Sequence, residues 1–289
     1  MSEEPAPSNE TESSSDRAAS YEIPQIGIGT YDVEPDVCTA AVTAALNCGY
    51  RHVDTAEMYG TESAVGDAIE LADVDRENVF VATKVHSRNL SYDDVVEHAR
   101  ASRNRLGVDC IDLLYVHWPI RTYDPDETLA AFDELYDEGV VRHVGVSNYT
   151  PELLLEALEV LDAPLFAHQV ECHPLLQQDE LRRYAREHDH QLVAYSPLAK
   201  GAVSEVPELV EIADEYDATP AQVSLAWLLS KESVVAIPKS TSEAHIRENY
   251  EAQQLHLDEW ALNRIDEIDR TQRVVDVPAA PWNTERGGR

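Results

Sequence analysis

Length, composition and charge limit the kinds of protein that this sequence can encode. The chain has 289 residues, 43% of them hydrophobic, which is enough for one large core, and α/β barrels of this size are commonly single domains. Its 55 acidic against 22 basic residues give a formal net charge of -33, and the only lysines are Lys84, Lys200, Lys231 and Lys239. Nucleic acid and anionic membranes are therefore disfavoured partners, since phosphate contacts need clustered Lys and Arg.

The acidic residues are spread along the chain, which predicts a folded protein with an acidic surface. Such a surface resembles that of halophilic proteins, in which high salt screens the self-repulsion. Residues 1–20 are rich in Ser, Glu and Pro and lack an apolar segment, so we expect a disordered acidic leader and not a signal peptide. The four cysteines form no C-x-x-C pair, and no apolar run reaches the roughly 20 residues of a membrane helix. A reduced, cytoplasmic protein is expected.

From Tyr21 onwards, short apolar segments rich in β-branched residues alternate with segments of helical spacing. Most of the apolar segments are nearly continuous, as is typical of strands that are buried on both faces. They predict eight strands, at residues 23–29, 50–55, 78–84, 110–117, 141–147, 165–170, 191–196 and 233–239.

Helices are predicted between these strands, for example at residues 34–49, 91–107 and 150–161. Their ends carry residues that favour helix termini: Ser91 and Thr150 are candidate N-caps, Pro151 follows at the first helical position, and Gly49 closes the first helix.

Eight strands that alternate with helices, about 25 to 30 residues apart, predict parallel β/α units and a closed (β/α)8 TIM barrel. We expect this barrel to be a single domain over residues 21–289. An open, doubly wound sheet is disfavoured because no G-x-G-x-x-G follows the first strand and no G-x-x-x-x-G-K-[ST] is present.

Active sites of such barrels lie at the carboxyl ends of the strands. Polar residues stand at seven of the predicted ends: Asp54, Lys84, His117, Ser147 with Asn148, Gln169, Tyr195 with Ser196, and Lys239 with Ser240. Any one of them alone would be an ordinary loop or cap residue. Seven on one rim indicate a functional site.

Four side chains at this rim form a chemically coherent group: Asp54, Tyr59, Lys84 and His117. A tyrosine has a pKa of about 10 in water, and a neighbouring ammonium lowers that value. We therefore expect Lys84 to lower the pKa of Tyr59, and Asp54 to keep Lys84 charged and oriented. His117 is expected to hydrogen-bond to the same substrate oxygen as Tyr59, so that a carbonyl is polarised and protonated.

This pattern resembles the aldo-keto reductase family, in the group of 2,5-diketogluconate reductases and prokaryotic aldehyde reductases. GYRHVDTAEMYG, residues 49–60, looks like the first family signature, and IPKS looks like its cofactor lysine motif. ATK, ending at Lys84, and LLYVHWP, containing His117, look like its other catalytic segments. The likeness runs from about residue 21 to residue 282. It implies an NAD(P)H-dependent oxidoreductase that reduces an aldehyde or ketone to an alcohol by hydride transfer, with Tyr59 as the general acid.

The same resemblance implies a nicotinamide cofactor, NADP(H) with NAD(H) also accepted. It places Tyr195 against the nicotinamide ring, where an aromatic face gives hydride transfer a fixed orientation. Where the family usually carries an arginine, six positions after Lys239, this chain has His245. The cofactor-binding residues implied are Thr30, Ser147, Asn148, Gln169, Tyr195, Ser196, Leu198, Lys239, Ser240, Thr241, His245, Glu248 and Asn249.

Tyr31, Trp118 and Trp282 are expected to line the substrate pocket, with Trp282 on a closing C-terminal loop. The expected partner is a small carbonyl compound, and sugar aldehydes, keto acids, diketogluconate and methylglyoxal are all compatible. We expect a monomer or a weak dimer.

Two alternatives of other classes remain open. One is a metal-dependent barrel hydrolase, and the other is a nicotinamide-binding barrel with a sensor or subunit role. The segment ECHP, residues 171–174, together with His52 and His86 could suggest a metal centre, but nothing in the sequence assembles three ligands, so no metal site is predicted.

Overall fold

Eight parallel strands lie at the centre of the computed structural model, which describes residues 22–283; the leader expected at residues 1–20 lies outside them. Each strand pairs with the next along the chain. A parallel bridge between Ile26 and Ala236 joins the first strand to the last, so the barrel is closed. The strands are β1 (Ile28–Gly29), β2 (His52–Asp54), β3 (Phe80–Val85), β4 (Ile111–Val116), β5 (Val141–Ser147), β6 (Leu165–Glu171), β7 (Gln191–Tyr195) and β8 (Val234–Ala236).

The prediction of a (β/α)8 TIM barrel is confirmed, and each strand falls at its predicted segment. All six residues of β3 and of β4 are buried, because one face looks into the barrel and the other meets helices. β8 is shorter than predicted and ends before Pro238, which has no N–H to donate to a strand ladder.

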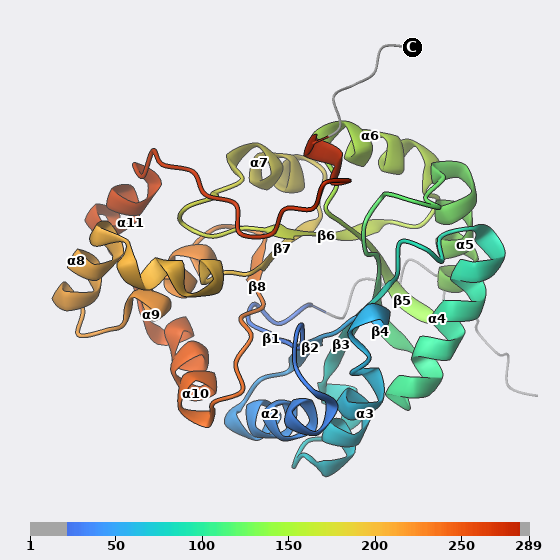
Figure 1. Cartoon of the computed structure of the whole chain (residues 1–289), viewed down its shortest axis with the longest axis horizontal. Coiled ribbons are helices and arrows are strands. Elements are labelled where there is room, and N and C mark those ends of the chain that lie inside the picture. Colours follow the sequence, from blue (N-terminus) through green and yellow to red (C-terminus); the bar gives the residue numbers. More distant parts are fainter. Residues whose placement is uncertain (1–21, 284–289) are drawn as a thin grey trace, which may run out of the picture.

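Helices follow the strands and surround the barrel (Figure 1). Two helices follow β7, and one more lies beyond the eighth β/α unit. Within residues 22–283, none of them has the length and apolar character needed to cross a membrane. The helices are α2 (Pro35–Cys48), α3 (Glu62–Leu71), α4 (Tyr92–Leu106), α5 (Pro125–Asp137), α6 (Pro151–Val160), α7 (Asp179–Glu187), α8 (Pro207–Glu215), α9 (Pro220–Leu229), α10 (Glu243–Glu251) and α11 (Glu259–Asp266).

The predicted helix ends are largely as expected. The Thr150 hydroxyl accepts a hydrogen bond from the backbone N–H of Leu153, and Gly49 ends α2 with a φ of 123°, a conformation that favours glycine. Ser91 is also at an N-cap position, but its hydroxyl donates to Asp94 Oδ2 at 2.5 Å instead of capping the backbone. The hydrogen bond to the Asp94 carboxylate thus holds the Ser91 hydroxyl in an orientation that makes no cap bond to the backbone.

The apolar core has two parts, one inside the barrel and one between the strands and the helices. The inner part is tight: a Cβ at Gly145 would lie 2.6 Å from the ring of Tyr115, which explains a glycine within a strand. The buried residues of the inner part are Ile23, Phe80, Ala82, Leu113, Tyr115, Ala167, Val193, Val235 and Ile237.

The segment after α11 returns from the edge of the barrel and crosses towards α6, as the red ribbon in Figure 1 shows. Glu171, at the end of β6, holds it there by accepting hydrogen bonds from the backbone N–H groups of Val274 (2.6 Å) and Val275 (2.7 Å). Glu171 is fully buried, and it also accepts from His173 Nε2 at 3.0 Å. Two members of the ECHP segment therefore have a structural role.

Candidate active site

A buried ion pair lies at the carboxyl ends of β2 and β3. Asp54 is the last residue of β2, and Lys84 is the next-to-last residue of β3; their exposed fractions are 3% and 1%. Lys84 Nζ donates to Asp54 Oδ1 at 2.5 Å and to the carbonyl oxygen of Thr55 at 2.7 Å. Burial lowers the pKa of Lys84, and the neighbouring Asp54 carboxylate opposes that shift.

Tyr59 and His117 complete the predicted group. Tyr59 ends the short 3-10 helix η1 (Glu57–Tyr59), and His117 is the first residue after β4. Their ring centroids are 5.6 Å apart, nearly perpendicular, and Lys84 Nζ lies 5.2 Å from the centroid of the Tyr59 ring. The fold thus brings together four side chains that the sequence spreads over more than sixty residues.

The electrostatics of Tyr59 differ from the sequence-based expectation. Burial, with a further contribution from the Asp54 carboxylate, raises the pKa of Tyr59 well above its usual value of 10. Burial and the Asp54 carboxylate therefore outweigh the lowering expected from Lys84, whose ammonium donates to Asp54 and Thr55. Tyr59 is a protonated phenol at neutral pH, which suits a proton donor.

His117 is a neutral imidazole. Burial is the main cause that holds the pKa of His117 well below its usual 6.5, and the Lys84 ammonium adds to the shift. Its Nδ1 is buried and has no hydrogen-bond partner among residues 22–283. A buried ring nitrogen without a partner is costly, and no protein hydrogen bond at this atom fixes the imidazole.

Beside this group, the ends of β5, β6 and β7 are joined by hydrogen bonds. Ser147 Oγ donates to the Gln169 carbonyl oxygen at 3.0 Å, and Asn148 Nδ2 donates to the His117 carbonyl oxygen at 3.0 Å. Tyr195 donates its hydroxyl proton to Asn148 Oδ1 at 2.8 Å. These bonds fix the orientation of the Tyr195 ring.

Gln169 makes one contact that the sequence did not predict. Its Nε2 donates to Asp54 Oδ2 at 2.7 Å, so its amide meets the acid of the ion pair. The neighbouring Thr30 hydroxyl donates to the Asp54 carbonyl oxygen at 3.1 Å. Ser196, after β7, has a φ of 47°, and Leu198 follows in the same turn.

The remaining predicted cofactor residues cluster after β8. Lys239, Thr241 and His245 are exposed. Among the described residues, no carboxylate lies within ion-pair distance of Lys239, whereas Lys84 and Lys231 are each paired. Ser240 Oγ accepts from the backbone N–H of Ser242 at 3.2 Å and orders the turn before α10.

Glu248 and Asn249 lie further along α10. Asn249 is buried, and Glu248 accepts a hydrogen bond from Thr219 Oγ1 at 2.6 Å. Thr219 is the N-cap of α9 and was not identified from the sequence; its T-P-A-Q capping-box pattern signals a helix start but no partner.

Aromatic rings border this group of four side chains. The Tyr31 and Tyr59 rings have centroids 5.2 Å apart, and the Trp118 and Trp282 rings have centroids 5.5 Å apart. The guanidinium carbon of Arg273, which the sequence did not single out, lies 4.0 Å from the Trp282 ring centroid. A cavity of about 150 Å³ lies between the loops after β5 and β6 and this C-terminal segment, and its lining includes Asn148, Arg273 and Trp282.

The comparisons with known proteins show the family to which the chain belongs. The model of the aldo/keto reductase family matches residues 25–270. A 9,11-endoperoxide prostaglandin H2 reductase of Trypanosoma cruzi is 37% identical over 263 residues, 90% of this chain and 92% of the relative. A methylglyoxal reductase, DkgB, of Salmonella typhi is 36% identical over 88% of this chain and 96% of its own.

Solved structures give the same result. A putative 2,5-diketo-D-gluconic acid reductase B superposes with a TM-score of 0.87 at 34% identity, over 89% of this chain and 92% of the other. An aldo-keto reductase of Bombyx mori in complex with NADP has a TM-score of 0.82 at 29% identity, over 89% and 92% of the two chains. The chain belongs to the aldo-keto reductase family. It is therefore an oxidoreductase that reduces carbonyl groups with a nicotinamide cofactor.

Proposed function

We propose that this chain reduces small aldehydes or ketones to alcohols with NADPH, and that Tyr59 is the general acid. The observation that carries the proposal is the juxtaposition of the Tyr59 phenol with His117 and Lys84 at the barrel mouth. A bound nicotinamide supplies the hydride. Tyr59 donates the proton that the carbonyl oxygen needs, and the neutral imidazole of His117 hydrogen-bonds to the same oxygen.

Lys84 and Asp54 support this step without meeting the substrate. The ammonium lies close to the Tyr59 ring, so it stabilises negative charge that develops on the phenol as the proton leaves. Asp54 helps to keep that ammonium charged, because it opposes the lowering of the Lys84 pKa that burial causes. Tyr31, Trp118 and Trp282 are proposed as the walls of the substrate pocket.

The residues present fit a nicotinamide dinucleotide. Tyr195 offers an aromatic face whose hydroxyl is held by Asn148, and Lys239 is an exposed cation without a carboxylate partner among residues 22–283. We infer that Tyr195, Ser147, Asn148 and Gln169 orient the nicotinamide, and that Lys239 attracts the 2′-phosphate, which favours NADPH over NADH. Thr30, Ser196, Leu198, Ser240, Thr241, His245, Glu248 and Asn249 remain the other proposed cofactor contacts.

The substrate class can be identified by a panel of carbonyl compounds. Methylglyoxal, 2,5-diketogluconate, a sugar aldehyde and a keto acid are each mixed with enzyme and NADPH, and loss of nicotinamide absorbance is followed. Tyr59→Phe, which removes only the phenolic oxygen, is expected to lower kcat by about 10² to 10⁴ and to leave NADPH binding unchanged. A Tyr59→Phe enzyme with more than about half of wild-type turnover would contradict the assignment of the acid.

The same assay separates the alternatives. A sensor or subunit would bind NADPH but reduce no member of the panel, and a metal-dependent hydrolase would lose activity with a chelator. We also propose a reducing, cytoplasmic location and a monomer or weak dimer. The location is favoured by the thiols at Cys38, Cys48, Cys110 and Cys172, all of which are free in the structure.

A further inference from the structure

The turn that carries Tyr59 has few bonds of its own. Within η1, Tyr59 N donates to the Ala56 carbonyl oxygen at 3.0 Å, and Gly60 N donates to the Glu57 carbonyl oxygen at 3.3 Å. Met58, between Glu57 and Tyr59, is half exposed and so packs only partly. A three-residue 3-10 turn with two backbone bonds does not by itself fix the direction of a side chain.

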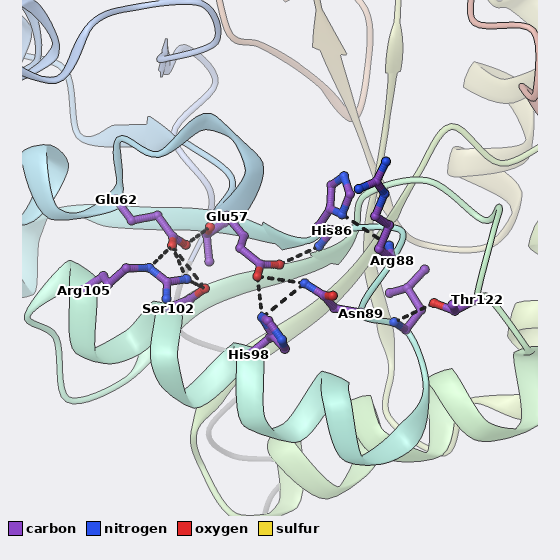
Figure 2. Close-up of polar contacts among 11 residues, drawn as sticks. Glu57, Glu62, His86, Arg88, Asn89, His98, Ser102, Arg105 and Thr122 are labelled. Atoms are coloured by element: carbon purple, nitrogen blue, oxygen red, sulfur yellow. Dashed lines mark hydrogen bonds and ion pairs between the residues drawn. The ribbon is translucent and has the colours of Figure 1, made fainter.

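The Glu57 side chain supplies the missing attachment. Its Oε2 accepts from the backbone N–H of His86 at 2.9 Å, and its Oε1 accepts from Asn89 Nδ2 at 2.9 Å and pairs with His98 Nδ1. Figure 2 shows the carboxylate directed at all three groups. The Glu57 side chain is only 14% exposed, so these bonds are largely shielded from water.

The partners of Glu57 belong to the next β/α unit. His86 comes two residues after Lys84, and Glu57 comes two residues before Tyr59. The Glu57–His86 hydrogen bond therefore joins the backbone beside the proton donor to the backbone beside its supporting ammonium. His98, on α4, adds a third attachment; α4 is the second α-helix after the turn along the chain.

We propose that Glu57 is a positioning residue for Tyr59, and that His98 is its anchor on α4. The inference rests on the proposed role of Tyr59 as general acid. Glu57 touches neither substrate nor cofactor; it holds η1 at a fixed place relative to β3, so the phenol and the Lys84 ammonium keep their separation. A displacement of about 1 Å in such a group costs up to about a hundredfold in rate.

Glu57→Gln is the informative variant because it keeps the shape of the side chain. The amide has one acceptor oxygen, and its NH₂ group meets N–H donors where the second carboxylate oxygen stood. We expect kcat to fall about tenfold or more, with the Kd for NADPH, from quenching of tryptophan fluorescence, within about twofold of wild type. The isotope effect on kcat with NADPH deuterated at the transferred position should be at least as large as in the wild type, because hydride transfer is slowed.

Two further variants separate positioning from loss of charge or of folding. Glu97→Gln removes the same charge from an exposed residue adjacent to His98 on α4, and it should leave kcat unchanged. His98→Ala should lower kcat in the same direction as Glu57→Gln. His98→Asn should restore most of it, because the amide Nδ2 takes the place of the imidazole Nδ1 as donor.

The inference is overturned if Glu57→Gln turns over within about twofold of wild type. It is also overturned if kcat, NADPH affinity and melting temperature fall together, because that result describes general loss of structure. A wild-type chain that reduces no carbonyl compound would instead refute the proposed function. That result is obtained before any variant is compared, so the two failures are distinguishable.

Discussion

Asp54 and Gln169 meet across the mouth of the barrel, where Gln169 Nε2 donates to Asp54 Oδ2 at 2.7 Å. The other carboxylate oxygen, Oδ1, accepts from Lys84 at 2.5 Å. Both oxygens of one acid are thus occupied, one by the ammonium that supports Tyr59 and one by a residue proposed to hold the nicotinamide. Asp54 therefore links the proposed proton donor to the proposed cofactor contacts.

Asp54→Asn is therefore expected to damage both stability and activity. The asparagine oxygen can still accept from Lys84, but its NH₂ group faces the amide donor of Gln169, and Lys84 loses its counter-charge. Breaking a buried ion pair by removing one partner typically costs about 3 to 5 kcal/mol. We expect a loss of this order in the free energy of unfolding, measured with urea, together with at least a tenfold lower kcat, about 1.4 kcal/mol.

The exposed pair Arg264–Glu211 supplies the control. Its side chains are 40% and 52% exposed, so Glu211→Gln should change the unfolding free energy by less than about 1 kcal/mol. Equal losses in the two variants would mean that burial does not strengthen the Asp54–Lys84 pair.

The pH dependence of reduction should follow the shifts at Tyr59 and His117. The pKa of Tyr59 is raised by burial, so the donating, protonated form persists from neutral to alkaline pH and is lost only as the pH passes above the usual value of about 10. The pKa of His117 is lowered by burial, so its imidazole is neutral near pH 7 and gains a proton only in acid. We expect kcat/KM to be constant from about pH 6.5 to about 9.

The profile is measured as kcat/KM against pH with one good substrate, at constant salt. A fall centred between about pH 7 and 8 would mean that Lys84 lowers the pKa of Tyr59 after all. That result would support the sequence-based expectation over the structure.

The positions of the site residues could be predicted from the sequence because they follow from topology. Once eight apolar segments are recognised, a parallel barrel places Asp54, Lys84 and Gln169 at the same end. Contacts between loops could not be predicted in this way. Glu57 bonds to His86, which is 29 positions further along the chain, and Glu171 bonds to Val274, which is 103 positions further along. No local sequence pattern indicates either contact.

The raised pKa of Tyr59 could not be predicted from the sequence either, for a different physical reason. The direction of the pKa shift depends on whether burial or the nearby ammonium has the larger effect, and burial has the larger effect here. The sequence correctly supplies the groups, whereas their relative strength requires the geometry.

The acidic surface predicts a dependence of stability on salt. With a net charge of -33, repulsion among the acids acts over the whole surface when the Debye length grows from about 3 Å at 1 M to about 30 Å at 0.01 M salt. The melting temperature should therefore rise with sodium or potassium chloride. Chloride is preferred to sulfate, which strengthens apolar burial by a separate effect. A melting temperature that does not change between about 0.1 and 3 M chloride, at fixed pH, would refute the halophile-like interpretation.

The cofactor preference should depend on Lys239 and His245. Lys239 has no carboxylate partner among residues 22–283, so it can attract a 2′-phosphate, but His245 lacks the planar, permanently charged fork that arginine offers. Arg247 lies two positions further along α10, on a different face, and is not an obvious substitute. We expect a modest preference for NADPH that becomes stronger with His245→Arg and weaker with Lys239→Ala.

The measurement is kcat/KM for NADPH and for NADH in the wild type and both variants, between about pH 6 and 8. His245→Arg should strengthen the NADPH preference throughout this range, since guanidinium stays charged. Arg247→Gln, which removes a cation from the same helix, should leave the preference unchanged. A preference for NADH at every pH that Lys239→Ala does not alter would mean that neither side chain contacts the phosphate.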